Sequence, residues 1–324
     1  MQVLGIDVGG TKVEIASVVD GRALEPRQIP TPLESSSALI DGIEALAREV
    51  IESDGQPEAI GVGVPSQIDF ATGTVIASVN IPLEGVPLRD ELERRFDIPV
   101  FVDNDANVAA LAEAEEIGSR NLLMLTLGTG VGGGVVIDGR IFRGASGRGA
   151  ELGHMVVDMD GRPCQGSCPN RGCLESVASG TALVREVSLA VARQPDTEIG
   201  RAMEGGRELT GPMVTEMARA GDPVARGAIE VIGRALGVGL ANISNIFCPQ
   251  VIVIGGGVSA AGELLLEPAR EVMRRRALAP GRDDVRIEAA AFGADAGMIG
   301  AAMLAREWPD DVPSAGGTAA AGAS

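Results

Sequence analysis

The sequence predicts an α/β protein made of two similar halves, each opening with a strand, a glycine turn and a second strand. The first such segment covers residues 3–22 and the second covers residues 125–140. When the chain is shifted by 118 residues without gaps, Gly10-Thr11 falls on Gly128-Thr129, and an Asp-Gly-Arg turn follows in both copies. The same order of strands in both copies favours an internal duplication over a chance match.

Helices and strands alternate after each of these hairpins, which is typical of sheets with parallel strands. In the first half we expect a helix near 35–53, strands at 59–65 and 99–104, and a helix near 106–116. In the second half we expect helices near 175–193, 210–220, 222–246, 262–278 and 293–306, and strands at 250–257 and 285–290.

Two duplicated α/β halves with glycine turns have the layout of the actin-like ATPase and sugar-kinase fold, with a cleft between two ribonuclease-H-like domains. We expect the domains at 1–117 and 118–308, with the last helix able to pack on the first domain. Residues 309–324 are rich in Ala, Gly, Ser and Pro and predict a disordered tail. Small ligands prefer such interfaces between domains.

The composition argues against nucleic acid and membranes as partners. The net charge is −18, which repels both nucleic acid and anionic lipid. No apolar run approaches the ~18 residues of a membrane span, and the N-terminus lacks the features of a secretory signal. With four cysteines and no export signal, we expect a cytoplasmic protein whose thiols are reduced or bound to metal.

The first glycine turn, DVGGTK, has the residues of a phosphate-binding loop. Asp7 can hold Mg²⁺, because hard cations prefer oxygen ligands. Glycines at Gly9 and Gly10 let successive backbone N–H groups converge on an anion, and Thr11 or Lys12 can touch a phosphate. The alternative is an ordinary β-hairpin turn.

The second turn, GTGVGG at 128–133, fits the pattern G-x-G-x-x-G of dinucleotide-binding proteins. That motif requires a helix to follow, whereas an apolar hairpin follows here, so we reject the dinucleotide interpretation. A third turn ends a buried strand and precedes a helix, which suits an adenosine. The three turns together predict nucleotide binding, with further contacts from Gly128, Thr129, Gly130, Gly255, Gly256 and Gly257.

Polar residues gather where the apolar strand of 99–104 meets an alanine-rich helix. Asp103, Asn104 and Asp105 cannot all serve as a helix cap, which needs only one residue. Phosphoryl transfer to a sugar hydroxyl needs a carboxylate that receives the proton. We therefore expect one aspartate to act as general base.

The segment 151–175 concentrates metal-type ligands in a chain that has few of them. It holds His154, the only histidine, and three of the four cysteines, Cys164, Cys168 and Cys173. A carboxylate stands at each end of the segment, at positions 151 and 175. Unligated thiols in a surface loop are the alternative.

Five motifs in order, DVGGTK, DNDAN, LGTGVGGG, ELGH and GCLE, resemble the ROK family of sugar kinases and sugar-responsive repressors over about residues 3–306. The resemblance implies that Asp105 is the catalytic base. It also implies a zinc ion held by His154 and the three cysteines. The residues that it implies for sugar contact are Asn104, Asp105, Glu151, His154 and Glu175.

The chain departs from the family pattern in two places. The family spaces its cysteines as C-x-C-x4-C, whereas this chain has C-x3-C-x4-C, with Gly166 at the family's first cysteine position. Cys164 can bind zinc only if the loop bulges by two residues. Ser66-Gln67 replaces a glycine and an apolar residue in a loop that approaches the sugar, so the fit of the substrate is affected.

These observations favour an ATP-dependent hexose kinase that converts glucose to glucose 6-phosphate, with ATP, Mg²⁺ and Zn²⁺ as cofactors. The alternative is an N-acetylmannosamine or N-acetylglucosamine kinase, which shares the motifs. A non-catalytic, sugar-responsive regulator is a remote alternative, because family repressors carry a helix-turn-helix before the kinase-like body and this chain begins its first strand at Val3. We also expect a homo-oligomer, a dimer or a tetramer.

Overall fold

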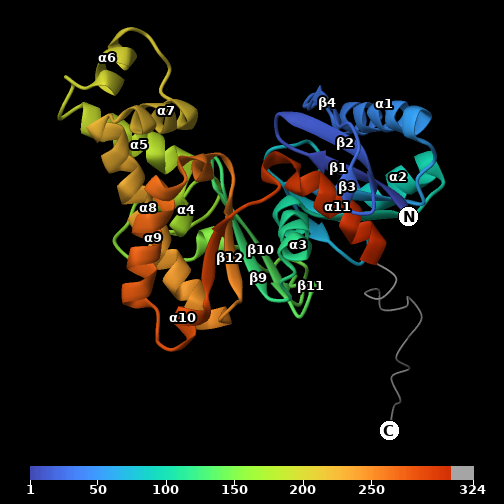
Figure 1. The fold of residues 1–324 in the computed structure, drawn as a ribbon. Helices are drawn as coiled ribbons and strands as arrows, with labels where there is room; N and C mark the ends of the chain where they lie inside the picture. Colours follow the sequence, from blue (N-terminus) through green and yellow to red (C-terminus); the bar gives the residue numbers. More distant parts are fainter. Residues whose placement is uncertain (308–324) are drawn as a thin grey trace. The chain divides into compact units, whose positions relative to one another are not determined.

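A computed structural model describes residues 1–307 of the chain; the tail predicted at 309–324 lies outside this range. The contacts divide the chain into two compact units (Figure 1). The N-terminal unit consists of Met1–Asp105 together with the residues from Ala301 onward, and the C-terminal unit is Ala106–Gly300. No helix among the described residues is long and apolar enough to cross a membrane.

The N-terminal unit is built on a six-stranded sheet whose main path runs β3-β2-β1-β5-β8, with β4 paired to β2. Its strands are β1 (Gln2–Val8), β2 (Lys12–Val19), β3 (Arg22–Ala23), β4 (Arg27–Pro30), β5 (Ala59–Val64) and β8 (Val100–Asn104). A separate hairpin pairs β6 (Ser66–Asp69) with β7 (Thr74–Ser78). The helices are α1 (Ser36–Asp54) and α2 (Leu88–Phe96). The second half of α11 (Ala296–Glu307) also belongs to this unit.

The C-terminal unit is built on a five-stranded sheet in the order β11-β10-β9-β12-β13. Its strands are β9 (Leu122–Leu127), β10 (Val131–Ile137), β11 (Arg140–Ile141), β12 (Val251–Gly255) and β13 (Arg286–Ala289). Its α-helices, after α3 (Asp105–Ile117), are α4 (Leu174–Ala178), α5 (Gly180–Val191), α6 (Glu198–Glu204), α7 (Gly211–Ala220), α8 (Pro223–Phe247), α9 (Glu263–Arg276) and α10 (Gly281–Asp284). Short 3-10 turns occur at η1 (Leu152–His154), η2 (Gly257–Ala261) and η3 (Gly293–Asp295).

The two sheets have the same topology, which supports the duplication. In each, the first strand pairs antiparallel with the second and parallel with a later strand. Val18 pairs with Ala23 in one unit and Val136 with Ile141 in the other, so this register repeats at the 118-residue shift seen in the sequence. The copies differ at the glycine turn, where Val8 faces Val13 but Leu127 faces Val131, so the second turn is one residue shorter.

The domain boundary expected after residue 117 differs from the division by contacts, which assigns α3 to the C-terminal unit. The reason is the close approach of α3 to β10. A Cβ atom on Gly134 would lie 2.3 Å from the carbonyl oxygen of Ala106, so the glycine permits backbone contact. The helix expected at 175–193 is two helices, because Ser179 ends α4 and caps α5 by accepting a hydrogen bond from the Ala182 N–H.

The core consists mainly of aliphatic side chains, with Met213, Met273 and Phe96 among them, as the shortage of aromatic residues requires. The long helix α8 is a packed core helix and not a membrane span. Cβ atoms on Gly233 and Gly237 would lie 2.5 Å from carbonyl oxygens of Leu265 and Ala269, so glycines let α8 and α9 pack closely.

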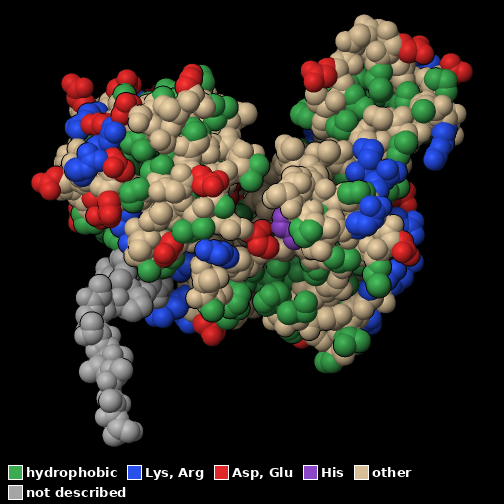
Figure 2. Space-filling view, turned by 180° about the vertical axis from the view of Figure 1, so that it is seen from behind, with side chains coloured by type: hydrophobic (Ala, Val, Ile, Leu, Met, Phe, Trp, Pro, Cys, Tyr) green, Lys and Arg blue, Asp and Glu red, His purple; other side chains and the backbone are tan. Residues whose placement is uncertain are grey.

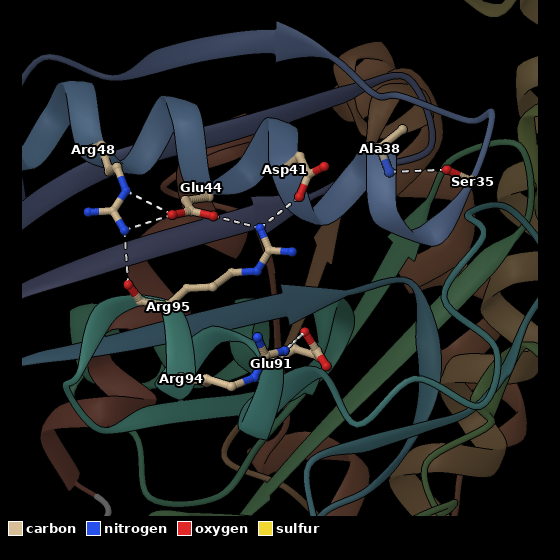
Figure 3. Close-up of polar contacts among 8 residues, drawn as sticks. All are labelled: Ser35, Ala38, Asp41, Glu44, Arg48, Glu91, Arg94 and Arg95. Atoms are coloured by element: carbon tan, nitrogen blue, oxygen red, sulfur yellow. Dashed lines mark hydrogen bonds and ion pairs between the residues drawn. The ribbon is translucent and has the colours of Figure 1, made fainter.

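Charged side chains connect α1 and α2 in the N-terminal unit (Figure 3). The Arg95 guanidinium forms ion pairs with Asp41 at 2.7 Å and with Glu44 at 2.6 Å, and Arg48 donates to the Arg95 carbonyl. Arg48 also donates to the Glu44 carboxylate at 2.8 Å, and the hydrogen bonds from Arg48 and then Arg95 hold the pKa of Glu44 below its usual value. The sequence did not predict α2, and this network attaches it to α1.

The second half of α11 packs on β5 at Gly61, and a substitution of this glycine tests that packing. A Cβ atom on Gly61 would lie 1.7 Å from the carbonyl oxygen of Ala301. We expect Gly61→Ala to lower the free energy of unfolding by about 4 kcal/mol or more, because the added methyl group overlaps a backbone carbonyl. Denaturant unfolding measures this.

The matched control is Gly227→Ala on α8, where a Cβ atom has nothing within 4 Å. This change should be neutral or stabilise by up to about 1 kcal/mol, because alanine favours a helix over glycine. Equal stability of the two variants would contradict the packing of α11 on β5.

Candidate active site

The carboxyl ends of three parallel strands bring acidic residues to one edge of the N-terminal sheet. Asp7 in β1 and Asp103 in β8 both pair with Gly63 in the strand between them. Asp105 follows β8 directly as the first residue of α3. The carboxyl edge of such a sheet is where α/β proteins bind ligands.

Asp7 and Asp105 interact electrostatically at this edge. Burial, as the largest cause, and the negative charges of Asp105 and Glu14 together raise the pKa of Asp7 from 3.8 to about 7, whereas Lys12 opposes the shift. Lys12 itself forms an ion pair with Glu14 at 2.6 Å. A divalent cation at Asp7 would favour the ionised carboxylate, and so this edge suits a Mg²⁺ ion.

The other two polar residues of the DNDAN motif have different surroundings. The Asp103 side chain is buried and accepts a hydrogen bond from the Asn104 N–H at 2.7 Å. The Asn104 side-chain amide donates to the carbonyl oxygen of Ser66 at 3.3 Å. Asp103 therefore stabilises the strand end, and Asp105 is the aspartate that is only partly buried.

The first glycine turn is held through its carbonyl groups. The Gly9 N–H donates to the Lys12 carbonyl, and Thr31 donates from its hydroxyl to the Gly9 carbonyl at 2.7 Å and from its N–H to the Thr11 carbonyl at 3.0 Å. Thr31 thereby fixes Gly9, Gly10 and Thr11 from one side. Thr31 was not predicted from the sequence, because no local pattern links it to a turn 22 residues earlier.

The second glycine turn, Gly128-Thr129-Gly130, is held in the same way by α5. The Gly180 N–H donates to the Gly128 carbonyl at 2.8 Å, and the Thr181 hydroxyl donates to the Thr129 carbonyl at 2.8 Å. Neither Gly180 nor Thr181 was predicted, although Gly180 is required: a Cβ atom there would lie 2.8 Å from the Gly128 carbonyl oxygen.

The third turn lies against the end of β9. Gly256 has a φ of 81°, and a Cβ atom on it would lie 2.6 Å from the backbone of Leu127. Gly255 pairs with Thr126, and Gly257 begins η2. The second and third glycine turns are therefore neighbours at one edge of the C-terminal sheet.

The ELGH turn packs on β10 through two glycines. A Cβ atom on Gly153 would lie 2.0 Å from the Val131 carbonyl oxygen, and one on Gly133 would lie 2.7 Å from the Ala150 carbonyl oxygen. Glu151 is exposed, and His154 is partly buried and reaches the surface in Figure 2 (purple). The strand that carries the glycine motif therefore also positions these two side chains.

The four metal-type ligands come together. The ligand atoms of His154, Cys164, Cys168 and Cys173 all lie within 4.8 Å of one another. Cys164 Sγ lies 3.5 Å from His154 Nδ1, and the Sγ atoms of Cys168 and Cys173 lie 3.9 Å apart. Cys248 is exposed at the end of α8 and does not belong to this group.

The separations of 3.5 and 3.9 Å are close to those of a tetrahedral zinc site. With Zn–S bonds of about 2.3 Å and Zn–N bonds of about 2.0–2.1 Å, the ligand atoms of such a site lie about 3.5–3.8 Å apart. Burial and the neighbouring thiols Cys173 and Cys168 raise the pKa of Cys164 to about 12. A bound cation would favour the thiolate of Cys164, which is the form that binds metal, so the cluster has the chemistry of a metal site.

The altered cysteine spacing is accommodated by backbone pairing. The Cys164 N–H donates to the Asn170 carbonyl, and the Gly172 N–H donates to the Arg162 carbonyl, so the two arms of the loop run together. Gly166, with a φ of 60°, lies in the extra residues between Cys164 and Cys168. The thiol of Cys164 consequently reaches the cluster despite the longer spacing.

Glu175, at the start of α4, contacts both the glycine turn and the cysteine cluster. Its Oε2 accepts a hydrogen bond from the Val131 N–H at 2.9 Å, and its Oε1 lies 3.7 Å from Cys164 Sγ. A Cβ atom on Gly130 would lie 2.2 Å from Oε2, so the glycine makes room for the carboxylate. This contact orients Glu175, for which the sequence resemblance implied a role in sugar binding.

A family model described as "ROK family" matches residues 3–308 of the chain. The chain belongs to the ROK family. It is 37% identical over 314 residues to a glucokinase from Halalkalibacterium halodurans, covering 94% of each chain, and 34% identical to an N-acetyl-D-glucosamine kinase from Escherichia coli, covering 93% of this chain and 98% of the relative. A ROK family glucokinase from Streptomyces griseus, solved with glucose and AMPPNP, shares the fold with a TM-score of 0.82 and 37% identity, over 94% of this chain and 99% of that one.

These matches confirm the predicted family and its actin-like ATPase and sugar-kinase fold. The site residues predicted from the sequence fall into two groups. Those of DVGGTK and DNDAN lie in the N-terminal unit, and those of the second and third glycine turns, ELGH and the cysteine segment lie in the C-terminal unit.

Proposed function

We propose that this ROK protein transfers the γ-phosphoryl group of ATP to the 6-hydroxyl of glucose. It is an ATP-dependent hexose kinase, and the observation that carries this conclusion is the match over nearly the whole chain to glucokinases, one of them solved with glucose and an ATP analogue. The acidic edge of the N-terminal sheet and the glycine turns supply the groups that phosphoryl transfer needs.

In this proposal Asp105 accepts the proton of the attacking hydroxyl, and Asn104, Glu151, His154 and Glu175 bind the sugar. Carboxylates accept hydrogen bonds without donating, which suits neighbouring hydroxyls on one edge of a sugar ring. The glycine turns bind the phosphates of ATP through backbone N–H groups, and Asp7 binds Mg²⁺ directly or through water.

We further propose that the cysteine cluster holds one structural Zn²⁺ ion, which fixes the segment between Glu151 and Glu175. The other expectations stay predictions: a homo-oligomer, a cytoplasmic location, and no nucleic acid or membrane partner. In the view of Figure 2, acidic and basic side chains are mixed on the N-terminal unit, and basic side chains predominate along one side of the C-terminal unit.

Metal analysis tests the zinc site. The purified protein should contain one Zn²⁺ per chain, and Cys164→Ser should lose most of it, because structural zinc contributes apparent binding free energies of about 10–16 kcal/mol through a complete ligand set. Cys248→Ser, outside the cluster, should keep the full metal content. A metal-free protein with full activity would contradict the site.

Substitution of Asp105 tests the general base. Asp105→Asn keeps the shape of the side chain but cannot accept the proton, so kcat should fall about 10² to 10⁴-fold while glucose binding is largely retained. Asp90→Asn, an exposed aspartate in α2 of the same unit, should leave kcat unchanged. More than half of the wild-type kcat in Asp105→Asn would exclude Asp105 and leave Asp103 as the candidate.

A substrate panel tests the choice of glucose. With Mg-ATP, kcat/KM for glucose should exceed that for mannose, fructose, N-acetylglucosamine and N-acetylmannosamine. A site that pairs with hydroxyls rejects analogues lacking one by about 10⁴-fold, so a substituent at C2 should separate these sugars clearly. An N-acetylated hexose with a higher kcat/KM than glucose would establish the second candidate, which the similarity to an N-acetyl-D-glucosamine kinase supports.

A further inference from the structure

One side chain joins the cysteine segment to the second glycine turn. Gln165 directly follows Cys164, and its side-chain amide donates to the Thr129 carbonyl at 3.4 Å and to the Ser179 hydroxyl oxygen at 3.2 Å. Ser179 is fully buried and caps α5. Gln165 therefore contacts both the turn and the start of the helix that holds it.

The carbonyl that Gln165 contacts controls where the turn's N–H groups point. In a trans peptide the carbonyl and the N–H of the next residue point in opposite directions. Gly180 holds the Gly128 carbonyl, and Thr181 and Gln165 both hold the Thr129 carbonyl, so the N–H groups of Thr129 and Gly130 point away from α5.

Those two N–H groups are available for a ligand. Among residues 1–307, neither the Thr129 N–H nor the Gly130 N–H donates to a protein acceptor. Thr129 is exposed and Gly130 is partly exposed. Two N–H groups that are oriented in advance bind an anion more tightly than a turn that must be ordered on binding.

We propose that Gln165 is a positioning residue that makes nucleotide affinity depend on the metal. A metal ion on Cys164 fixes the backbone next to Gln165, and Gln165 then holds the Thr129 carbonyl so that the turn presents its N–H groups to the nucleotide phosphates. The inference rests on the proposed kinase function and adds that the metal-binding loop serves the nucleotide as well as the sugar.

The first test replaces the amide by a group of similar length that cannot donate. Gln165→Met should raise Kd for Mg²⁺ with the ATP analogue AMPPNP about 3- to 10-fold in calorimetry, which is the contribution of one hydrogen bond. In kinetics, KM for ATP should rise by the same factor, whereas KM for glucose and kcat should stay within about twofold. Gln194→Met, an exposed glutamine of the same unit, is the matched control and should change none of these values.

The second test measures the coupling to the metal. Removal of the metal with a chelator, checked by metal analysis, should weaken AMPPNP binding to the wild-type protein several-fold, and should weaken it less in Gln165→Met, because the connection is already lost. An equal loss in both proteins would overturn the coupling. A Kd for Gln165→Met within twofold of wild type, with the metal retained, would overturn the positioning role.

Thr181→Val provides an independent test of the Thr129 carbonyl if Gln165→Met loses its metal. Thr181 lies outside the metal loop and donates to the same carbonyl, so this variant should retain full metal content and still bind AMPPNP about 3- to 10-fold more weakly. An unchanged Kd would overturn the inference. A wild-type protein that fails to bind AMPPNP would instead refute the proposed kinase function.

Discussion

Close backbone contact at the glycines of β10 is the constraint on which the C-terminal unit depends. Successive side chains of a strand point to opposite faces, and β10 has glycine at three successive positions, 132, 133 and 134. On one face, Gly134 admits the start of α3, and on the other, Gly133 admits the ELGH turn. A side chain at Gly133 or Gly134 would meet the backbone of the neighbouring element, so the strand sets the position of both elements.

The same strand connects the predicted chemical groups of this unit. Its first residue, Val131, donates its N–H to Glu175, and its carbonyl lies against Gly153 of the ELGH turn. The turn before it presents the N–H groups of Thr129 and Gly130, which donate to no acceptor within residues 1–307. The sugar ligands proposed for this unit, His154 of the proposed metal site and the proposed phosphate-binding turn are therefore all in contact with or next to one strand, as precise positioning of reacting groups requires.

In both units a threonine hydroxyl holds a backbone carbonyl of the glycine turn. In the N-terminal unit, Thr31 holds the turn's carbonyls, and in the C-terminal unit Thr181 does so from α5. The threonines come from different elements and do not correspond under the 118-residue shift. The two sheets thus share strand order and pairing, whereas their glycine turns are supported by threonines from different elements.

The fold class, the duplicated hairpins, most helices and strands, and the motifs of the ROK family could be predicted from the sequence, because strand periodicity, glycine turns and ligand clusters are local patterns. It could not predict α2, the break between α4 and α5, or the assignment of α3 to the C-terminal unit, since these depend on ion pairs, caps and backbone contacts. Only the tertiary structure brought Cys164 into the ligand cluster despite its spacing, and only it revealed Thr31, Gln165 and Thr181. The physical reason is that a hydrogen bond from a side chain to a distant carbonyl leaves no periodicity in the sequence, and the folded chain alone decides which carbonyl it reaches.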